Sequence, residues 1–272
     1  MKAIFLKELK LSRKGLLIWS LVILVTIGFG IVEYPMVSQN VDLIMEGMAI
    51  LPRIVVIMFG LEGIGLQTSI DYHLALFFWI SLIVYFHAII TGVTVLGREQ
   101  RDRTFEFIYT KPYKRNEIII AKVLSGIVNI SILALVTWIG SIFTVYFIDG
   151  NVESYINGKL VVRAVTETII GMFFVQLILY SVGLLLAGII KSHKKALRFG
   201  YLFMIFSYVL SIAIQYSGKI DFLRILSPLS YFEGLPVVNH GIAMLFVIIS
   251  VIIAVGLVYV SIKKSERKDL II

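Results

Sequence analysis

The chain has 272 residues, of which 59% are hydrophobic and 15% are charged, and its net charge is +8. Its mean hydropathy of +0.95 lies outside the range of a soluble domain of this length. Uncharged apolar runs of about twenty residues recur along it, whereas a transmembrane β-barrel would need short alternating segments. The sequence therefore predicts an all-α polytopic membrane protein, with one transmembrane domain over residues 1–272.

The first predicted element is a basic amphipathic helix over residues 1–15. Lys7, Lys10 and Lys14 share one of its faces, and apolar side chains such as Phe5 lie roughly opposite. This pattern is typical of a helix that lies in the membrane interface, and the alternative is a disordered basic leader. The apolar run that follows reaches membrane length with no small-residue cleavage site behind it, so we expect this segment to be retained.

Six apolar runs have the length of membrane-spanning helices. Their predicted limits are 16–33, 74–96, 119–147, 165–190, 197–216 and 241–262. Between the first two, residues 50–66 are too short and too charged for a span, so an interfacial or re-entrant helix is expected there. Before the last span, Pro228, Gly234 and Pro236 exclude one continuous helix.

The basic residues predict the orientation of these spans. Six spans place both termini on one side, and all but five of the 25 Lys and Arg residues fall on that side. The five on the other side are Arg53, Lys159, Arg163, Lys219 and Arg224. The positive-inside rule then makes both termini cytoplasmic, in a multi-pass protein of the cell membrane. Most of the positive charge flanks spans, where it meets anionic lipid headgroups, so we expect membrane lipids and no nucleic acid as partners.

The loop between the second and third spans, residues 98–116, is the longest densely charged segment. Residues 100–110 can form a short helix on which three apolar side chains share one face at i, i+3, i+4 spacing. Such a helix suits insertion into a cleft on a soluble partner, and the alternative is a basic turn lying on headgroups. The residues expected to contact the partner are Phe105, Ile108, Tyr109 and Pro112, with a charged rim of Arg101, Glu106 and Arg115.

The order of residues in this loop resembles a known family. The order is Glu99, Thr104, Glu106, Phe107, Ile108, Pro112, Arg115 and Lys122. An acidic residue, a Thr-x-Glu step, an apolar helix, Pro, a basic residue and a final Lys occur in the same order in the permeases of type-2 ATP-binding-cassette exporters. The basic N-terminal helix, the six spans, an LPxxxxxxFG element from Leu51 to Gly60 and LSPLSYF before the last span agree with this family. In the family a Gly often precedes the Thr, where this chain has Arg103.

The resemblance implies an N-terminal elbow helix, a cytoplasmic coupling helix in the loop and a separate ATPase subunit that docks on it. It also implies a second permease copy, as a homodimer rather than a heterodimer, because six spans are half of the usual twelve. The chain has no GxxxxGK[ST] phosphate loop and no cysteine, and its four histidines lack metal-ligand spacing. We therefore expect no catalytic residue, no metal and no cofactor in this chain, with ATP hydrolysed on the partner subunit.

Polar residues within the spans are candidates for a cargo path. His87 and Thr91 share a face of the second span, and Tyr208, Ser211 and Gln215 share a face of the fifth. In the family the path lies near these two spans, between two copies of the membrane domain, which favours a path lining. A neutral His bonded to a neighbouring helix remains the alternative for His87, and helix packing remains the alternative for the fifth-span face. A stripe containing Gly183 and Ala187 in the fourth span favours close helix packing.

The resemblance thus predicts export of an amphipathic or hydrophobic cargo, such as a peptide, a drug or a lipid-like molecule. Two other function classes stay open. A membrane-embedded lipid-processing enzyme would need clustered acid–base groups at the membrane surface, and the nearest outer pair is Glu233 with His240. An assembly or sensor protein could use the same loop to hold a partner without transport.

Overall fold

The computed structural model describes residues 2–102, 114–150, 155–156 and 159–267. Almost all of these residues are helical, and six of the helices are long and apolar enough to cross a membrane. The six are α1 (Lys2–Gln39), α4 (Ser69–Asp102), α6 (Arg115–Asp149), α7 (Val161–Ile189), α8 (His193–Ser217) and α10 (Met244–Arg267). The predicted fold class and number of spans are confirmed.

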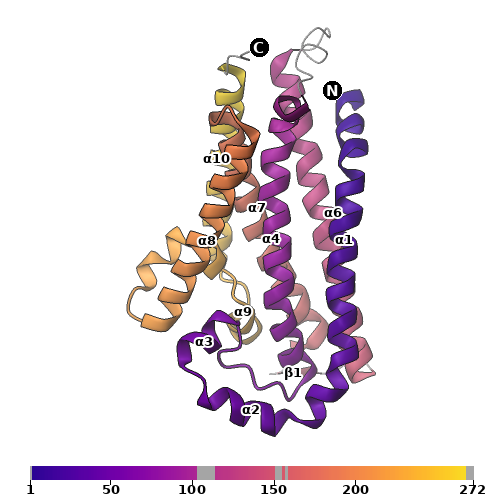
Figure 1. Cartoon of the computed structure of the whole chain (residues 1–272), viewed down its shortest axis with the longest axis vertical. Coiled ribbons are helices and arrows are strands. Elements are labelled where there is room, and N and C mark those ends of the chain that lie inside the picture. The colour runs from indigo at the N-terminus through magenta and orange to yellow at the C-terminus, as the bar shows by residue number, and fades with distance from the viewer. Residues whose placement is uncertain (1, 103–113, 151–154, 157–158, 268–272) are drawn as a thin grey trace.

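The remaining elements are short and lie mostly at one end of the bundle. They are α2 (Val41–Ile50), α3 (Arg53–Met58), β1 (Tyr155–Ile156), β2 (Lys159–Leu160), the 3₁₀ turns η1 (Asp221–Leu226) and η2 (Pro228–Ser230), and α9 (Gly234–His240). The strands β1 and β2 pair antiparallel. The N- and C-terminal helices start and finish at the same end of the bundle, which we call the termini end, and α2, α3 and α9 lie toward the other end, the far end (Figure 1).

The predicted elbow between residues 1–15 and a span from residue 16 is not confirmed. Instead α1 is continuous from Lys2 to Gln39. The backbone ladder of this helix meets no proline before Pro35, and Gly15 alone does not break it. The helix therefore continues through the polar residues on both sides of the predicted span, residues 16–33. In the same way, helix α4 continues through Asp102 and α6 begins at Arg115, inside the predicted limits of the loop.

Helix α7 is the centre of the bundle, where it packs against α4, α6, α8 and α10. Its closest neighbour is α4, because a Cβ added to Gly92 would lie only 3.0 Å from the Cα of Gly183. The close approach predicted for the Gly183 stripe is thereby confirmed. Toward α6, the buried Tyr180 hydroxyl donates to the Val123 carbonyl oxygen at 2.8 Å, so its polar end is satisfied inside the core.

The far end contains two irregular segments, of which the one before α10 was predicted from its prolines. The segment after α3 turns through Gly60 and Gly63, both with positive φ, so residues 50–66 form a short helix and a turn and do not span the membrane. Before α10, the chain forms η1, η2 and α9 in place of one helix, as Pro228 and Pro236 predicted. Arg53 fastens the first break to α8, donating to the Gln215 carbonyl oxygen at 3.1 Å.

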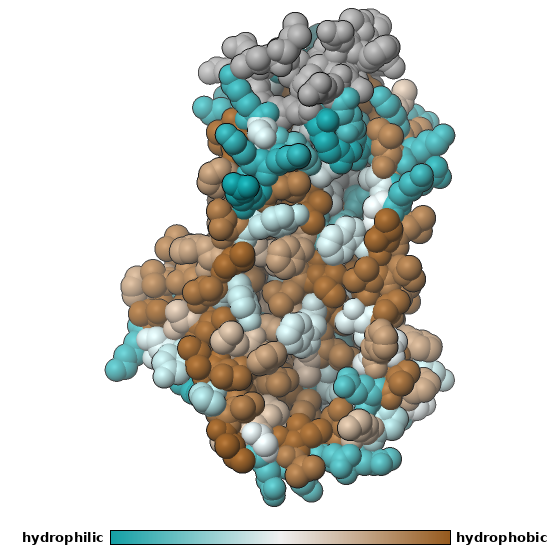
Figure 2. All heavy atoms as spheres, in the orientation of Figure 1, coloured by the Kyte–Doolittle hydropathy of each residue, from teal (hydrophilic) through white to brown (hydrophobic). Residues whose placement is uncertain are grey.

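The outer surface of the bundle is apolar over its middle. Large hydrophobic side chains are exposed along α1, α8 and α10, among them Leu17, Phe206 and Ile252. Figure 2 shows this apolar middle in brown, with hydrophilic residues gathered toward the two ends. A surface of this kind matches the hydrocarbon core of a bilayer between two polar interfaces.

Candidate functional site

Four charged residues meet at the termini end, three of them buried and Arg98 partly buried, and we call them the charge quartet: Glu8, Arg98, Glu99 and Lys122. Arg98 donates to Glu8 at 2.7 Å, and Lys122 Nζ lies 3.3 Å from the other Glu8 oxygen. Lys122 also pairs with Glu99 and donates to the Val95 carbonyl oxygen at 3.2 Å. Helices α1, α4 and α6 are thus joined by one network of ion pairs.

The charge quartet is balanced, with two acidic and two basic side chains. The side chains of Glu8 and Lys122 are only 2% and 4% exposed, so each charge depends on the others for compensation. A buried charge that loses its partner is strongly destabilising, whereas a complete network is tolerated. The quartet therefore fixes the relative position of three helices just where α4 ends and α6 begins.

The residues expected to dock a partner fall between these two helices. Phe105, Glu106, Ile108, Tyr109 and Pro112 lie outside the described residues, so the predicted coupling helix stays a prediction. The rim residues Arg101 and Arg115 are described. Arg101 is exposed and pairs with Asp102 at 2.8 Å, which lowers the pKa of the Asp102 carboxyl. Arg115 is the first residue of α6.

The second-span candidates lie in a cleft of about 240 Å³ beside the charge quartet, between α1, α4 and α6. The Thr91 hydroxyl lies 3.2 Å from His87 Nε2, and the Trp19 ring meets the imidazole edge-on at 5.7 Å. His87 is therefore buried, with a hydrogen bond to Thr91 of the same helix and a ring contact to Trp19 of α1. Both the path lining and the bond to a neighbouring helix stay open for His87. Asn129 of α6 lines the same cleft.

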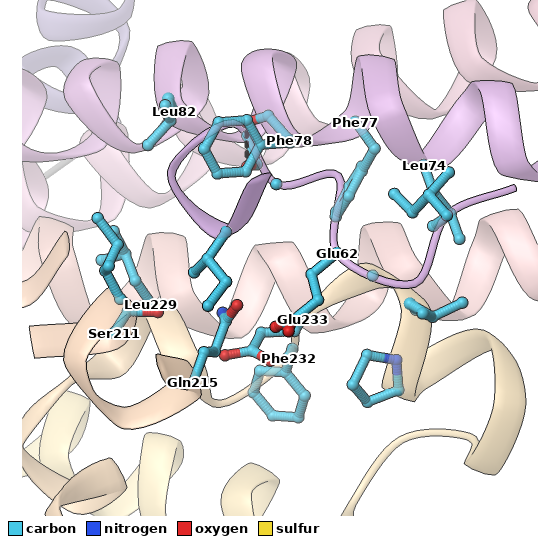
Figure 3. Close-up of a pocket in the computed structure, with 18 of the residues that line it drawn as sticks. Glu62, Leu74, Phe77, Phe78, Leu82, Ser211, Gln215, Leu229, Phe232 and Glu233 are labelled. Atoms are coloured by element: carbon cyan, nitrogen blue, oxygen red, sulfur yellow. Dashed lines mark hydrogen bonds between the residues drawn. The ribbon is translucent and has the colours of Figure 1, made fainter. Parts of the chain in front are cut away.

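The fifth-span candidates line a different and larger pocket, of about 440 Å³, toward the far end. We call it the far pocket; Tyr208, Ser211 and Gln215 form one of its walls, and Figure 3 shows the pocket with Glu62 and Glu233 reaching into it. The Tyr208 hydroxyl donates to the Met58 carbonyl oxygen, so it also holds α3 in place. The predicted path residues are therefore brought into two separate pockets, one at each end of α4.

Sequence reasoning missed Glu62 and named Glu233 only as the outer acid nearest His240, whereas the structure places both in the far pocket. Each stands within a break, Glu62 between Gly60 and Gly63 and Glu233 before Gly234. Burial raises the pKa of the Glu233 carboxyl, Glu62 and Asp221 raise it further, and Gln215 and Arg224 oppose the shift. His240, named with Glu233 as the nearest outer pair for the enzyme alternative, is exposed at the end of α9 and does not line the pocket.

The sequence also offered little indication that Glu8 is a site residue, because it lies in a basic segment that is typical of a solvent-exposed helix face. Glu99 and Lys122, in contrast, were already singled out by the loop motif, and the structure pairs them directly. Two elements of the motif that lie 23 residues apart in the sequence thus form one contact. No group of three or more His, Asp or Glu residues suited to hold a metal ion occurs among the residues that the structure describes.

The comparisons with known proteins agree with this architecture. A comparison with curated proteins found no significant match. The family model described as ABC-2 family transporter protein matches residues 2–267, which include all six membrane-spanning helices and the loop between α4 and α6. Members of this family are membrane transport components that normally work with a cassette ATPase, and are not themselves the catalytic subunit. Since the match covers nearly the whole chain, the protein belongs to the ABC-2 family of transporter permeases.

Proposed function

We propose that this chain is the permease half of an ATP-driven exporter, which moves an amphipathic or hydrophobic cargo out of the cytoplasm. Its membership of the ABC-2 family and its six-helix membrane bundle support this proposal. Two copies would form a symmetric homodimer carrying two ATPase subunits, since six spans are half of the usual number. The termini end would face the cytoplasm of the cell, because all but five Lys and Arg residues belong to that side.

The observation that carries this proposal is the charge quartet at the root of the loop. An ATPase that moves the loop between α4 and α6 must displace helices, and those helices are clamped together by Glu99 and Lys122. Glu8 adds α1 to the same clamp. Because a buried ion network resists partial separation, α1, α4 and α6 would move as one unit when the loop is pushed. This is the mechanical connection that a coupling loop requires.

Helix α4 extends this connection to the far pocket. It carries Arg98 and Glu99 of the quartet near one end and lines the far pocket through Phe77 and Tyr85. Movement at the ATPase side would therefore reach the candidate cargo site along one continuous helix. Tyr208, Ser211 and Gln215 of α8 complete the wall that the cargo would contact.

The docking step is tested by co-purification with the cassette ATPase. The double variant Phe105→Asp with Tyr109→Asp should abolish co-purification, since burying two carboxylates without partners costs several kcal/mol. Lys194→Asp is the matched control, because it places a carboxylate on an exposed position of the neighbouring turn on the same side. Undiminished co-purification of the double variant, with both variants inserted normally, would refute the coupling assignment.

The cargo wall is tested by ATP turnover of the reconstituted complex. If the wall contacts cargo, the triple variant Tyr208→Leu, Ser211→Leu and Gln215→Leu should change which cargo stimulates turnover, while the dimer still assembles. If the wall only packs helices, the same variant should lower dimer yield and leave the cargo preference unchanged. Wild-type transport by the triple variant would rule out the path.

A further inference from the structure

The far pocket has the size and the walls of a small-molecule site. Its volume of about 440 Å³ lies within the range of ligand sites, about 300–1,000 Å³. Aromatic side chains from three segments line it, including Phe77 and Tyr85 of α4, Tyr208 of α8 and Phe232 before α9. Aromatic faces carry partial negative charge and attract organic cations.

The polar groups of the far pocket are acidic or neutral. Figure 3 shows Glu62, Gln215 and Glu233 converging from three separate segments of the chain. Among the described residues that line the pocket, none is Lys, Arg or His. Any charge that the pocket presents to a ligand is therefore negative.

The two carboxylates differ in how far they are already compensated. Glu62 is paired with Arg53 at 2.6 Å, and Arg53 also donates to the Gln215 and Tyr216 carbonyl oxygens. Glu233 has no ion pair among the described residues, and its Oε1 is buried and accepts no hydrogen bond from them.

Arg224 acts on Glu233 through its charge, but its own donors and its guanidinium face are engaged elsewhere. Arg224 donates to the Ser230 carbonyl oxygen at 2.9 Å, and its guanidinium lies over the Phe246 ring at 5.5 Å. Arg53, another cation at this end, is held by Glu62. A buried carboxylate oxygen without a partner is costly, and a cation or a proton would relieve that cost.

We propose that the far pocket binds the cationic group of an amphipathic organic molecule, with Glu233 as its counter-charge and the aromatic walls around its apolar part. The volume is too large for a bare metal ion, and a proton would leave the rest of the cavity unfilled. That this molecule is the cargo rests on the proposed transport function, whereas the binding itself does not. The pocket thus narrows the cargo from amphipathic molecules in general to those with a positive charge.

The test uses a probe and its neutral isostere on the purified full-length chain in a neutral detergent. The probe is benzyltrimethylammonium, and the isostere is neopentylbenzene, in which a carbon replaces the nitrogen. Titration calorimetry should show the cation binding at least about tenfold more tightly than the isostere. Equal affinities for the two molecules in the wild-type chain would overturn the proposal without any variant.

A variant then identifies the counter-charge. Glu233→Gln keeps the size and shape of the side chain and should lower the affinity for the cation by about tenfold or more, with little effect on the isostere. Glu46→Gln is the matched control, since Glu46 is exposed on α2 and does not line the pocket. Unchanged cation affinity in a folded Glu233→Gln chain would overturn the assignment of the counter-charge.

Two further measurements are needed. The first identifies whether the natural ligand is a lipid headgroup or a free cation, and the second tests whether the ligand is transported. In phosphatidylglycerol nanodiscs, added phosphatidylethanolamine should weaken probe binding if a lipid headgroup is the natural occupant, and should leave it unchanged if the occupant is a free cation. Either result supports a cation site, because both ligands carry an ammonium group. If the probe binds but fails to change ATP turnover of the complex, the cargo assignment fails while the binding site stands.

Discussion

Removing the Lys122 ammonium should strongly destabilise the fold, because it leaves a buried acidic partner unpaired. Lys122 Nζ contacts Glu99, the second Glu8 oxygen and the Val95 carbonyl oxygen. In Lys122→Met, Glu8 keeps Arg98 at 2.7 Å, but Glu99 is left with no cation among the described residues. The charge quartet changes from neutral to a net charge of −1 inside a buried site.

The magnitude follows from the burial of both partners. Breaking a buried ion pair by removing one partner costs about 3–5 kcal/mol, because the other charge remains uncompensated. For a chain of this size, that cost lowers the Tm by on the order of 10 °C. Thermal unfolding of the detergent-solubilised chain, followed by the fluorescence of its three tryptophans, measures the shift directly.

A double variant distinguishes the charge imbalance from simple loss of packing. Lys122→Met with Glu99→Gln restores a neutral site that keeps the Glu8–Arg98 pair, so most of the lost stability should return. Asp102→Asn is the control, because it breaks an exposed pair on the same helix end and should cost at most about 1 kcal/mol. If the double variant is as unstable as Lys122→Met, or if Lys122→Met melts like the wild type, the reasoning on the charge quartet is refuted.

Three further predictions concern topology, packing and pH. In Ser217→Cys the thiol should react with an impermeant reagent applied outside intact cells, whereas in Ser192→Cys it should react only after permeabilisation. Labelling of Ser192→Cys from outside would show that the predicted orientation is wrong. Gly183→Ala should destabilise the bundle by about 1–3 kcal/mol, since the added Cβ would lie 2.5 Å from the Ile89 carbonyl oxygen of α4. Gly256→Ala has open space around the added Cβ and should not destabilise it; thermal unfolding compares the two variants. Burial raises the pKa of Glu233 above its ordinary value of 4.5, so between these two values the folded chain holds a proton that the unfolded chain releases. The free energy of unfolding should therefore fall as the pH rises from 4.5 through the raised pKa. The fall should be smaller in Glu233→Gln, which has no carboxyl to titrate.

The six spans could be predicted because their signal is local. Each apolar run must be buried in lipid or protein, and its length alone marks it as a span. The ends of the helices could not be predicted in the same way, since α1 continues to Lys2 through residues that are polar but still favour a helix. The break before α10 was also predictable, because the prolines around η2 act on the backbone at their own positions. Gly60 and Gly63 act in the same local way on the turn after α3.

The pockets were only partly predictable, because a pocket combines residues from separate segments. The polar face of Tyr208, Ser211 and Gln215 has a helical spacing that the sequence displays directly. Glu62 and Glu233 have no such spacing, since they come from two separate irregular segments (Figure 3). Their convergence depends on how α3 and α9 pack against α8 and α4, and no local pattern encodes that packing.

The charge quartet could not be predicted from its residues taken one at a time. Judged alone, Glu8 in a basic segment would be predicted to be a solvent-exposed carboxylate. Judged alone, a lysine such as Lys122 would be predicted not to be buried, because burying its charge costs free energy. Each of these judgements fails because the free energy of a buried charge depends on which charges the neighbouring helices bring to it. Glu99 and Lys122 were recognisable only through the order of the loop motif. Their contact joins an acid at the end of α4 to a base in the N-terminal part of α6, two sites that no single helix pattern links.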